Sequence, residues 1–388
     1  MQPLTHQIKQ AAAELGFAVT GITSAAPLFR DLAVLEEWIG AGFAAGMDYM
    51  VRKPGLKGQP KELVPYAASV ISLTVNYYSS APRFEHRNRY GRVARYAWGR
   101  DYHEAVKPRL ARLASRIEQI VASSGAAPDG FKYRCFVDAV PLLERAIAQR
   151  AGIGFFGKNT NLLQPRGGSW HFLSELLINV ELPEEGQRSR VGCGSCTLCL
   201  GACPTGAFAG PFWLDSRLCI SYLTIENKGP IPTDLRAAIG EWLFGCDVCQ
   251  EVCPFNRFSS DTDWPELRPA AGPGPAIDVA ELLNIDTDEK FRARFKDTAL
   301  ARPKRRGLLR NAAVVAANIG CVAALPALVE RIERDPEPLI RQHAIWAAAR
   351  LDERISRGPI ERAAKTDCDV GVRKEAEAVL EMNAPQRG

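Results

Sequence analysis

The segment VGCGSCTLCLGACPTGA, residues 191–207, holds four cysteines with the spacing C-x2-C-x2-C-x3-C, followed directly by a proline. This spacing is typical of the bacterial ferredoxin run. A tight wrap points the first three sulfurs at three irons of one cubane, and the turn carries the fourth to a second cluster. Thiolates are soft, charged ligands that suit iron. The segment therefore predicts a ferredoxin-like domain with the ligands Cys193, Cys196, Cys199 and Cys203.

A second, shorter motif follows in GCDVCQEVCPFN, residues 245–256. It is one ligand short of the full run, because Leu243 stands where a further cysteine would be and cannot bind iron. Cys219 is the only other cysteine nearby, and it brings the ligand count to eight. We assign one [4Fe–4S] cluster to Cys193, Cys196, Cys199 and Cys253, and the other to Cys203, Cys219, Cys246 and Cys249.

Zinc is the alternative metal for these cysteines, since C-x2-C pairs also bind zinc. The Cys-Pro endings and the spacing of both motifs favour iron–sulfur clusters instead. Three cysteines lie outside the motifs, Cys135, Cys321 and Cys368, and we predict them to be small buried apolar residues.

Composition places the chain among globular proteins. It has 388 residues, 46% hydrophobic and 24% charged, which indicates two to three domains and excludes a disordered or fibrous chain. No apolar run approaches the length of a membrane helix. The first 17 residues predict an amphipathic helix and lack the features of a signal peptide, so we expect a cytoplasmic protein.

Charge is distributed unevenly. The net charge is +5, and residues 301–388 carry sixteen Lys and Arg against twelve Asp and Glu. This asymmetry suggests a polyanionic partner, although a solvated helical surface accounts for it equally well. The same tail repeats an Arg-headed, Ala-rich helix at 308–320, 339–351 and 371–382, which predicts an α-solenoid; a plain helical bundle is the alternative.

The first half of the chain alternates predicted strands and helices, which indicates a layered α/β sheet. The predicted strands are 17–23, 69–78, 131–137 and the end of 170–182, and the predicted helices are 5–16, 32–43, 101–124 and 141–152. Loop-like composition at 183–192 and 261–278 suggests boundaries. We expect three domains, 1–182, 183–260 and 261–388.

Several long segments resemble one known family, the epoxyqueuosine reductases, over nearly the whole chain and in one order. Besides the cysteine run and the helical tail, they are PYAASVISLTVNYY (65–78), ARYAWGRDYH (94–103), VDAVPLLERAIAQRAGIGFFGKNTNLL (137–163), GSWHFLSELL (168–177) and LCISYLTIENKGPIP (218–232).

The resemblance implies a fold and an activity. The fold is α+β and multidomain, with a nitroreductase-like α/β cobalamin domain, a ferredoxin-like two-cluster domain and C-terminal HEAT-like repeats that help to hold tRNA. The activity is the last step of queuosine biosynthesis, reduction of epoxyqueuosine to queuosine at the tRNA wobble position. The family uses cobalamin and two [4Fe–4S] clusters and is related to the reductive dehalogenases.

The resemblance also implies site residues. Asp138 matches the family's proposed proton donor, and burial beside a cofactor would raise its pKa; the alternative is an N-cap for the helix near Pro141. Candidate cobalamin contacts are Arg100, Asp101, Tyr102, Asp138, Lys158, Asn159, Ser169 and Ser221. Asp101 has a helix cap as its alternative role, and Lys158 and Asn159 have a solvated loop.

Candidate phosphate contacts lie in the tail, and they are Arg302, Lys304, Arg305, Arg306, Arg310 and Arg341. The other expected partner is an electron donor, which the sequence does not identify. We expect a monomer without membrane contact. Two competing functions are a dehalogenase-like corrinoid reductase of a small molecule and a non-catalytic two-cluster electron carrier. The basic tail argues against the first, and the second predicts that no cobalamin is bound.

Overall fold

The computed structural model describes residues 3–80, 88–138, 141–186 and 191–382. The chain forms two compact units, and each is assembled from three separate stretches. Unit 1 comprises residues 1–80, 99–217 and 247–272, and unit 2 comprises residues 81–98, 218–246 and 273–388. These units do not follow the three consecutive ranges predicted above, because segments distant in sequence pack together.

A four-stranded sheet forms the centre of unit 1. Its strands run in the order β1-β2-β7-β4, and each neighbouring pair is antiparallel. They are β1 (Val19–Ser24), β2 (Ser69–Asn76), β7 (His171–Ile178) and β4 (Tyr133–Phe136). Three of them lie within the predicted strand segments or one residue beyond them, whereas β7 begins near the start of 170–182, where the strand was expected at the end. The alternation of strand and helix patterns is confirmed.

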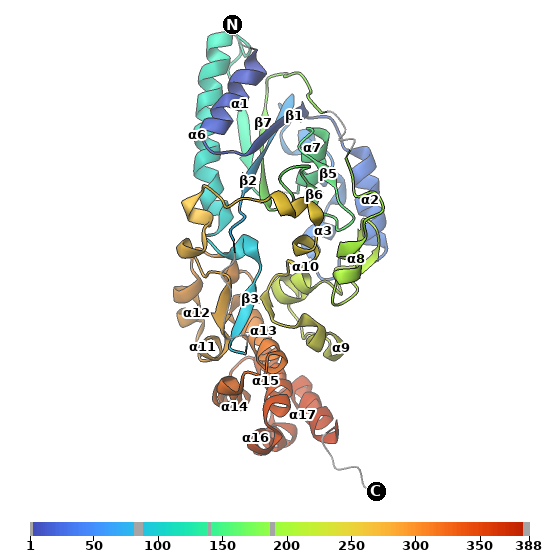
Figure 1. Ribbon diagram of the computed structural model, residues 1–388, viewed down its shortest axis with the longest axis vertical. Coiled ribbons are helices and arrows are strands. Elements are labelled where there is room, and N and C mark those ends of the chain that lie inside the picture. Colours follow the sequence, from blue (N-terminus) through green and yellow to red (C-terminus); the bar gives the residue numbers. More distant parts are fainter. Residues whose placement is uncertain (1–2, 81–87, 139–140, 187–190, 383–388) are drawn as a thin grey trace. The chain divides into compact units, whose positions relative to one another are not determined.

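Helices cover both faces of this sheet. In Figure 1, α1 (Leu4–Glu14) and α6 (Tyr102–Ser124) lie on one side of it, and α7 (Glu144–Arg150) lies on the other. Asp101 starts α6 as its N-cap, since its carboxylate accepts the backbone N–H of His103 at 2.9 Å. The helix α7 begins three residues later than predicted, which leaves room for a turn after β4.

Apolar side chains fill the space between the sheet and α7. Val70, Leu177 and Ile147 are fully buried there and pack with Phe136 and Leu142. Polar residues interrupt this apolar pattern in the two central strands. Their side chains are buried, and they are Ser69, Ser72 and Thr74 in β2 and Ser174 and Glu175 in β7. Buried polar groups need partners, so this part of the sheet is a candidate for function.

Shorter elements complete unit 1. The helices are α2 (Phe29–Gly40), α3 (Asp48–Val51), α4 (Pro54–Lys57), α5 (Pro60–Leu63), α8 (Leu198–Ala202) and α10 (Val248–Glu251). The strands are β5 (Phe155–Phe156), β6 (Leu162–Leu163), β8 (Phe208–Gly210) and β9 (Trp213–Leu214). Three 3₁₀ helices follow the second cysteine motif: Pro254–Phe258, Pro265–Leu267 and Pro269–Ala271. The cysteine run itself is mostly loop, as expected for a segment that wraps around a metal cluster.

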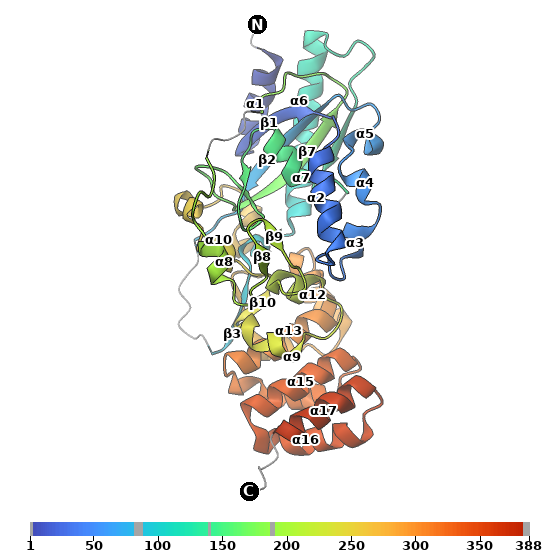
Figure 2. The same ribbon diagram turned by 90° about the vertical axis from the view of Figure 1, so that its right-hand side faces the viewer.

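Unit 2 combines a small sheet with a stack of helices (Figure 2). The sheet has the order β10-β3-β11, from Trp242–Phe244, Tyr90–Val93 and Ala276–Asp278. The helices are α9 (Thr233–Arg236), α11 (Val279–Leu283), α12 (Asp288–Phe295), α13 (Lys304–Asn318), α14 (Leu325–Arg334), α15 (Pro338–Leu351), α16 (Glu353–Thr366) and α17 (Val370–Met382). A π-helix spans Tyr222–Glu226, and short 3₁₀ turns lie at Arg95–Ala97, Ala237–Ile239, Ala299–Ala301 and Val322–Ala324.

The three helices predicted in the tail are confirmed as α13, α15 and α17. The helix α15 packs against α13, α14 and α17, and α16 packs against α17. Among the described residues, no helix combines the length and the apolar character needed to cross a bilayer.

Candidate functional site

The first cysteine run is held in place by Lys158. Its backbone N–H donates to Cys193 Sγ at 3.4 Å, and its Nζ donates to the carbonyl oxygens of Gly194 and Cys196 at 2.7 and 3.0 Å. The ammonium group therefore lies within the cysteine loop and holds its backbone in place. The contact of Lys158 with the corrin amides stays a prediction, since two of its three N–H donors bind carbonyl oxygens of the cysteine run.

The four thiols assigned to the first cluster lie within electrostatic reach of one another. Burial raises the pKa of Cys199, and the neighbouring Cys193 and Cys253 raise it further. Burial likewise raises the pKa of Cys253, with contributions from Cys193 and Cys196. The last thiol comes from the second motif, about fifty residues along the chain, so the fold brings together the set that ligand counting assigned to this cluster.

The donor set fits a cubane better than a single ion. Within the described residues, no three His, Cys, Asp or Glu side chains stand close enough together to hold a metal ion. A zinc ion would need its sulfurs about 2.3 Å from one point, whereas each thiolate of a cubane binds a different iron. None of the eleven cysteines, all of them described, forms a disulfide.

The other four predicted ligands lie in segments that are held by local hydrogen bonds. Cys203 and Cys249 belong to unit 1, where Cys203 Sγ accepts the backbone N–H of Ala207 at 3.3 Å. Cys219 and Cys246 belong to unit 2. There, Thr224 Oγ1 accepts the N–H of Gly245 at 2.9 Å, which joins the segments that carry these two cysteines.

The helix α13 supports those same segments from within unit 2. Asn311 Nδ2 donates to the carbonyl oxygens of Thr224 and Leu243 at 2.7 and 3.0 Å. Arg310 donates to the carbonyl oxygens of Leu223, Asn227 and Gly229 at 2.6–2.7 Å. Both side chains are fully buried, so their role is to anchor the chain around Cys219 and Cys246.

Three of the six proposed phosphate contacts are therefore wrong. Arg305, Arg310 and Arg341 are buried, and they bind Asp335, backbone carbonyls and Asp367 respectively. Burial removes these guanidinium groups from any ligand at the surface. Arg302, Lys304 and Arg306 are exposed around the start of α13. Arg302 pairs with Glu226 there, and Arg306 donates to the carbonyl oxygen of Lys228.

We expect Arg310→Ala to destabilise unit 2, because it leaves three buried carbonyl oxygens without donors. The local loss is on the order of 3 kcal/mol. Hydrogen exchange of peptides from residues 219–231 and 304–318 measures it. Arg357→Ala is the matched control and should leave both peptides protected, because this exposed arginine pairs with glutamates of its own helix. Equal exchange in the two variants would contradict the structural role of Arg310.

Two further candidate contacts tie the first half of unit 1 to the second cysteine motif. Asn159 Nδ2 donates to the carbonyl oxygen of Cys249 at 3.2 Å. Ser169 Oγ donates to Gln250 Oε1 at 2.8 Å, and its N–H donates to Asn256 Oδ1 at 2.7 Å. Both residues are almost fully buried and hold the Cys249–Cys253 segment. Their contact with a corrin ring stays a prediction.

Asp138 lies directly after β4, at the edge of the sheet. The Tyr102 hydroxyl donates to its Oδ2, and the Tyr102 ring stacks on Phe172 with centroids 4.3 Å apart. The helix-cap alternative is wrong, because the N-cap of α7 is Leu143. The side chain is exposed, so the expected burial of Asp138 is not provided by the chain alone. The arrangement presents an oriented carboxyl group to a ligand.

Two glutamates lie next to Asp138, the half-buried Glu144 and the fully buried Glu175. The Asp138 N–H donates to Glu144 Oε1 at 2.9 Å. Burial and the charge of Asp138 raise the pKa of Glu144 to about 7. Glu175 is fully buried, accepts from Ser72 Oγ at 3.2 Å, and has its pKa raised well above the usual value by burial and by Glu144. Sequence reasoning missed both residues; the available signal was a Glu within the apolar strand segment HFLSELLI.

His171 is a third residue that sequence reasoning missed. Its Nδ1 is buried and has no hydrogen-bond partner among the described residues. Burial lowers the pKa of His171 to about 4, so the ring is neutral at physiological pH. It precedes Phe172, the residue that stacks on Tyr102. A neutral ring nitrogen in this position suits a ligand with amide groups, such as those on a corrin.

The other candidates near Tyr102 behave differently from one another. The Asp101 carboxylate is occupied as the α6 N-cap and also contacts His103 Nδ1 at 2.7 Å, which confirms its alternative role. Arg100 is exposed, and its backbone N–H donates to the carbonyl oxygen of Glu266 at 2.8 Å. Ser221 lies in unit 2, directly before the π-helix.

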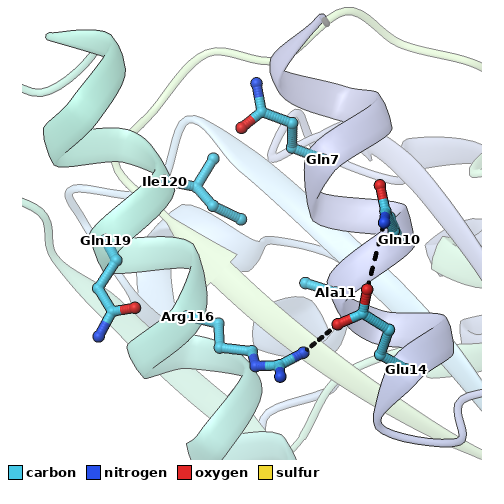
Figure 3. Close-up of a pocket in the computed structure, with 7 residues that line it drawn as sticks. All are labelled: Gln7, Gln10, Ala11, Glu14, Arg116, Gln119 and Ile120. Atoms are coloured by element: carbon cyan, nitrogen blue, oxygen red, sulfur yellow. Dashed lines mark hydrogen bonds and ion pairs between the residues drawn. The ribbon is translucent and has the colours of Figure 1, made fainter.

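An open pocket between α1 and α6 lies apart from all these residues. Figure 3 shows the side chains that line it, with Glu14 between Gln10 and Arg116. Arg116 Nη1 and Glu14 Oε2 are 2.7 Å apart, so the two charged side chains that line the pocket neutralise each other. No sequence-predicted site residue lines the pocket.

The remaining cysteines are of mixed exposure. Cys321 is buried, as predicted, and burial raises the pKa of the half-buried Cys135 to about 11. Cys368 is exposed, so the prediction of burial is wrong for it.

Comparisons with known proteins agree along the chain. Residues 192–256 match the family model of a 4Fe–4S double cluster binding domain, and residues 57–139 match that of the epoxyqueuosine reductase QueG. An epoxyqueuosine reductase of Pseudomonas aeruginosa is 41% identical over 356 residues, or 90% of this chain and 95% of its own. That of Escherichia coli is 37% identical over 91% of both chains.

Solved structures give the same result. The epoxyqueuosine reductase of Bacillus subtilis, described with its catalytic aspartate loop swung out of the active site, superposes with a TM-score of 0.87 at 31% identity. An epoxyqueuosine reductase crystallised with an epoxyqueuosine-modified tRNA-Tyr stem loop superposes with a TM-score of 0.84 at 31% identity. Each match covers 98% of both chains.

Proposed function

The chain belongs to the epoxyqueuosine reductase family, and we propose that it reduces epoxyqueuosine to queuosine at the wobble position of a tRNA anticodon. The observation that carries this proposal is the similarity to epoxyqueuosine reductases over about nine tenths of the chain. The two competing functions, a small-molecule corrinoid reductase and a non-catalytic electron carrier, are not favoured by these matches.

The test is an anaerobic assay with tRNA that contains epoxyqueuosine. Nucleoside mass spectrometry should show conversion to queuosine when cobalamin, reductant and iron-loaded enzyme are all present. Conversion that does not require cobalamin would contradict the proposed cofactor. A loaded enzyme that leaves the epoxide unchanged would contradict the proposed function.

The chemistry of epoxide reduction determines which groups the active site must supply. Converting an epoxide to an alkene consumes two electrons and two protons and releases the oxygen as water. Clusters transfer electrons one at a time, so two clusters in one chain suit electron supply. Cobalamin, when bound, supplies the cobalt centre at which the electrons reach the substrate. The chain must deliver a proton to the leaving oxygen, and Asp138 is the proposed donor.

The residues around Asp138 fit an amide-bearing cofactor. His171 offers an unpartnered buried nitrogen next to Phe172, and Phe172 stacks on Tyr102, whose hydroxyl donates to Asp138. We assign the cofactor contacts to His171, Phe172 and Tyr102. The other candidates from the sequence remain, and they are Arg100, Ser221, Lys158, Asn159 and Ser169, of which the last three also support the cysteine segments.

We retain the finer division of the chain as part of the proposal. Residues 1–182 form a nitroreductase-like cobalamin domain, 183–260 a ferredoxin-like domain with both clusters, and 261–388 a linker with HEAT-like repeats. The antiparallel sheet flanked by helices and the packed tail helices are compatible with this division. A cytoplasmic location, a monomeric state and a separate electron donor remain predictions.

The exposed cations at the start of α13 are the proposed tRNA contacts that remain. We expect the double variant Lys304→Ala/Arg306→Ala to bind tRNA less tightly, because phosphate contacts release counterions. Its plot of log affinity against log salt concentration should lose about one unit of slope per contact. Fluorescence anisotropy with a labelled anticodon stem loop measures this slope.

Arg357→Ala is the matched control. This exposed arginine pairs with Glu353 and Glu361 on its own helix, α16. It should leave the slope unchanged. An unchanged slope in the double variant would remove the start of α13 from the tRNA surface.

A further inference from the structure

The backbone at Asp138 adopts an unusual conformation. Its φ is +45°, in the left-handed region that residues other than glycine rarely occupy. Such a conformation persists only where its surroundings hold it. Two contacts do so: the Tyr102 hydroxyl donates to the Asp138 carboxylate, and the Glu144 carboxylate accepts the Asp138 N–H at 2.9 Å.

Glu175 lies next to Glu144 and contributes to its position. The Glu175 side chain points to the α7 side of the sheet, since it shares that face of β7 with Leu177, which packs against α7. Each of the two carboxyl groups affects the pKa of the other, so they lie close together. Glu175 Oε1 accepts from Ser72, and among the described residues its Oε2 is buried without a hydrogen-bond partner.

Two carboxyl groups can be hydrogen-bonded only when one of them carries a proton. The unpartnered Oε2 of Glu175 is the atom that gains a partner by carrying it. The charged groups that face Glu144 are Asp138, Glu175, His103 and Arg145. The raised pKa values of both glutamates agree with one proton retained between them near neutral pH.

We propose that Glu144 is a positioning residue for Asp138: its carboxylate fixes the Asp138 amide in the left-handed turn, and a proton on Glu175 holds Glu144 in place. This inference rests on the proposed function, because it assumes that Asp138 is the acid of the epoxide reduction. A general acid acts only from a defined position, and a misplacement of about 1 Å costs on the order of a hundredfold in rate.

The experiment compares Glu144→Ala with Glu144→Gln in the full-length, iron-loaded enzyme. The glutamine keeps an oxygen for the Asp138 N–H and offers an amide N–H to Glu175, whereas alanine offers neither. We expect Glu144→Ala to lower kcat by about ten- to a hundredfold with an unchanged KM for tRNA. Glu144→Gln should recover most of the loss.

Hydrogen exchange of the peptide that contains Asp138 gives a readout besides activity. Its amide should exchange faster in Glu144→Ala than in the wild type, and at the wild-type rate in Glu144→Gln. The control pair is Glu14→Ala and Glu14→Gln, an exposed carboxylate on α1 that pairs with Arg116. Neither control variant should change kcat or the exchange of this peptide.

The outcomes separate the two proposals. Wild-type exchange and kcat in Glu144→Ala overturn the positioning role, as does a Glu144→Gln variant as impaired as Glu144→Ala. Full activity of Asp138→Asn overturns the role of Asp138 instead. If Glu144→Ala does not fold, Glu175→Gln tests the shared proton, since its amide N–H replaces that proton; faster Asp138 exchange in this variant would contradict the pairing.

Discussion

Asp138→Asn is expected to lower the rate of epoxide reduction by about a hundredfold to ten-thousandfold, the range over which general acids contribute. The amide oxygen of asparagine can still accept from Tyr102, and asparagine tolerates the left-handed backbone better than most residues. The variant therefore retains the shape of the site and loses only the proton. A single-turnover assay with epoxyqueuosine-containing tRNA, read by nucleoside mass spectrometry, measures the rate.

The control for this prediction is Asp129→Asn, an exposed aspartate in the turn before β4. It should turn over at the wild-type rate. Iron content and tRNA affinity should be the same in both variants, so that a lower rate reports on chemistry. Wild-type turnover by Asp138→Asn would show that the proton comes from another group.

The second large effect concerns the first cluster. The double variant Cys193→Ala/Cys196→Ala removes two of its four proposed ligands. We expect iron to fall from about eight to about four atoms per chain after anaerobic reconstitution, since two clusters of four irons are proposed. Turnover should fall below detection, because one link for electrons to the active site is missing. Iron analysis and electron paramagnetic resonance measure the first effect.

Cys135→Ala/Cys368→Ala is the matched control, because it also removes two thiols. Neither residue is a proposed ligand; Cys135 is half-buried and Cys368 exposed. This control should keep about eight irons, the content of two four-iron clusters. Zinc in place of iron in the wild type, or full iron content in the Cys193→Ala/Cys196→Ala variant, would contradict the assignment of the clusters.

Cysteine spacing alone predicts three ligands of the first cluster. Cys193, Cys196 and Cys199 follow one another within seven residues, so local geometry already points them at one cluster. Counting added Cys253, and the structure brings this thiol within electrostatic reach of the other three. The strand β2 was likewise predicted from a short apolar run, and it is buried along almost its whole length.

For the arginines of the tail, the sequence pattern does not predict which side chains are exposed. Arg302 and Arg310 look equivalent in a basic stretch, yet the first is exposed and the second is fully buried against three carbonyl oxygens. A guanidinium group serves a phosphate and a backbone carbonyl equally well. Sequence therefore identifies a cation but not the acceptor that it finds.

Features that depend on short-range spacing and residue type were predicted from the chain: the two cysteine motifs of a double-cluster domain, and the strands and helices. Asp138 was predicted from the family resemblance. Contacts between distant segments were not predicted, and they include Lys158 in the cysteine loop, Asn159 and Ser169 against the second motif, and Glu175 next to Glu144. Local patterns arise from backbone geometry over a few residues. The partners of a buried polar group are instead selected by packing, which assembles unit 1 from three stretches of the chain.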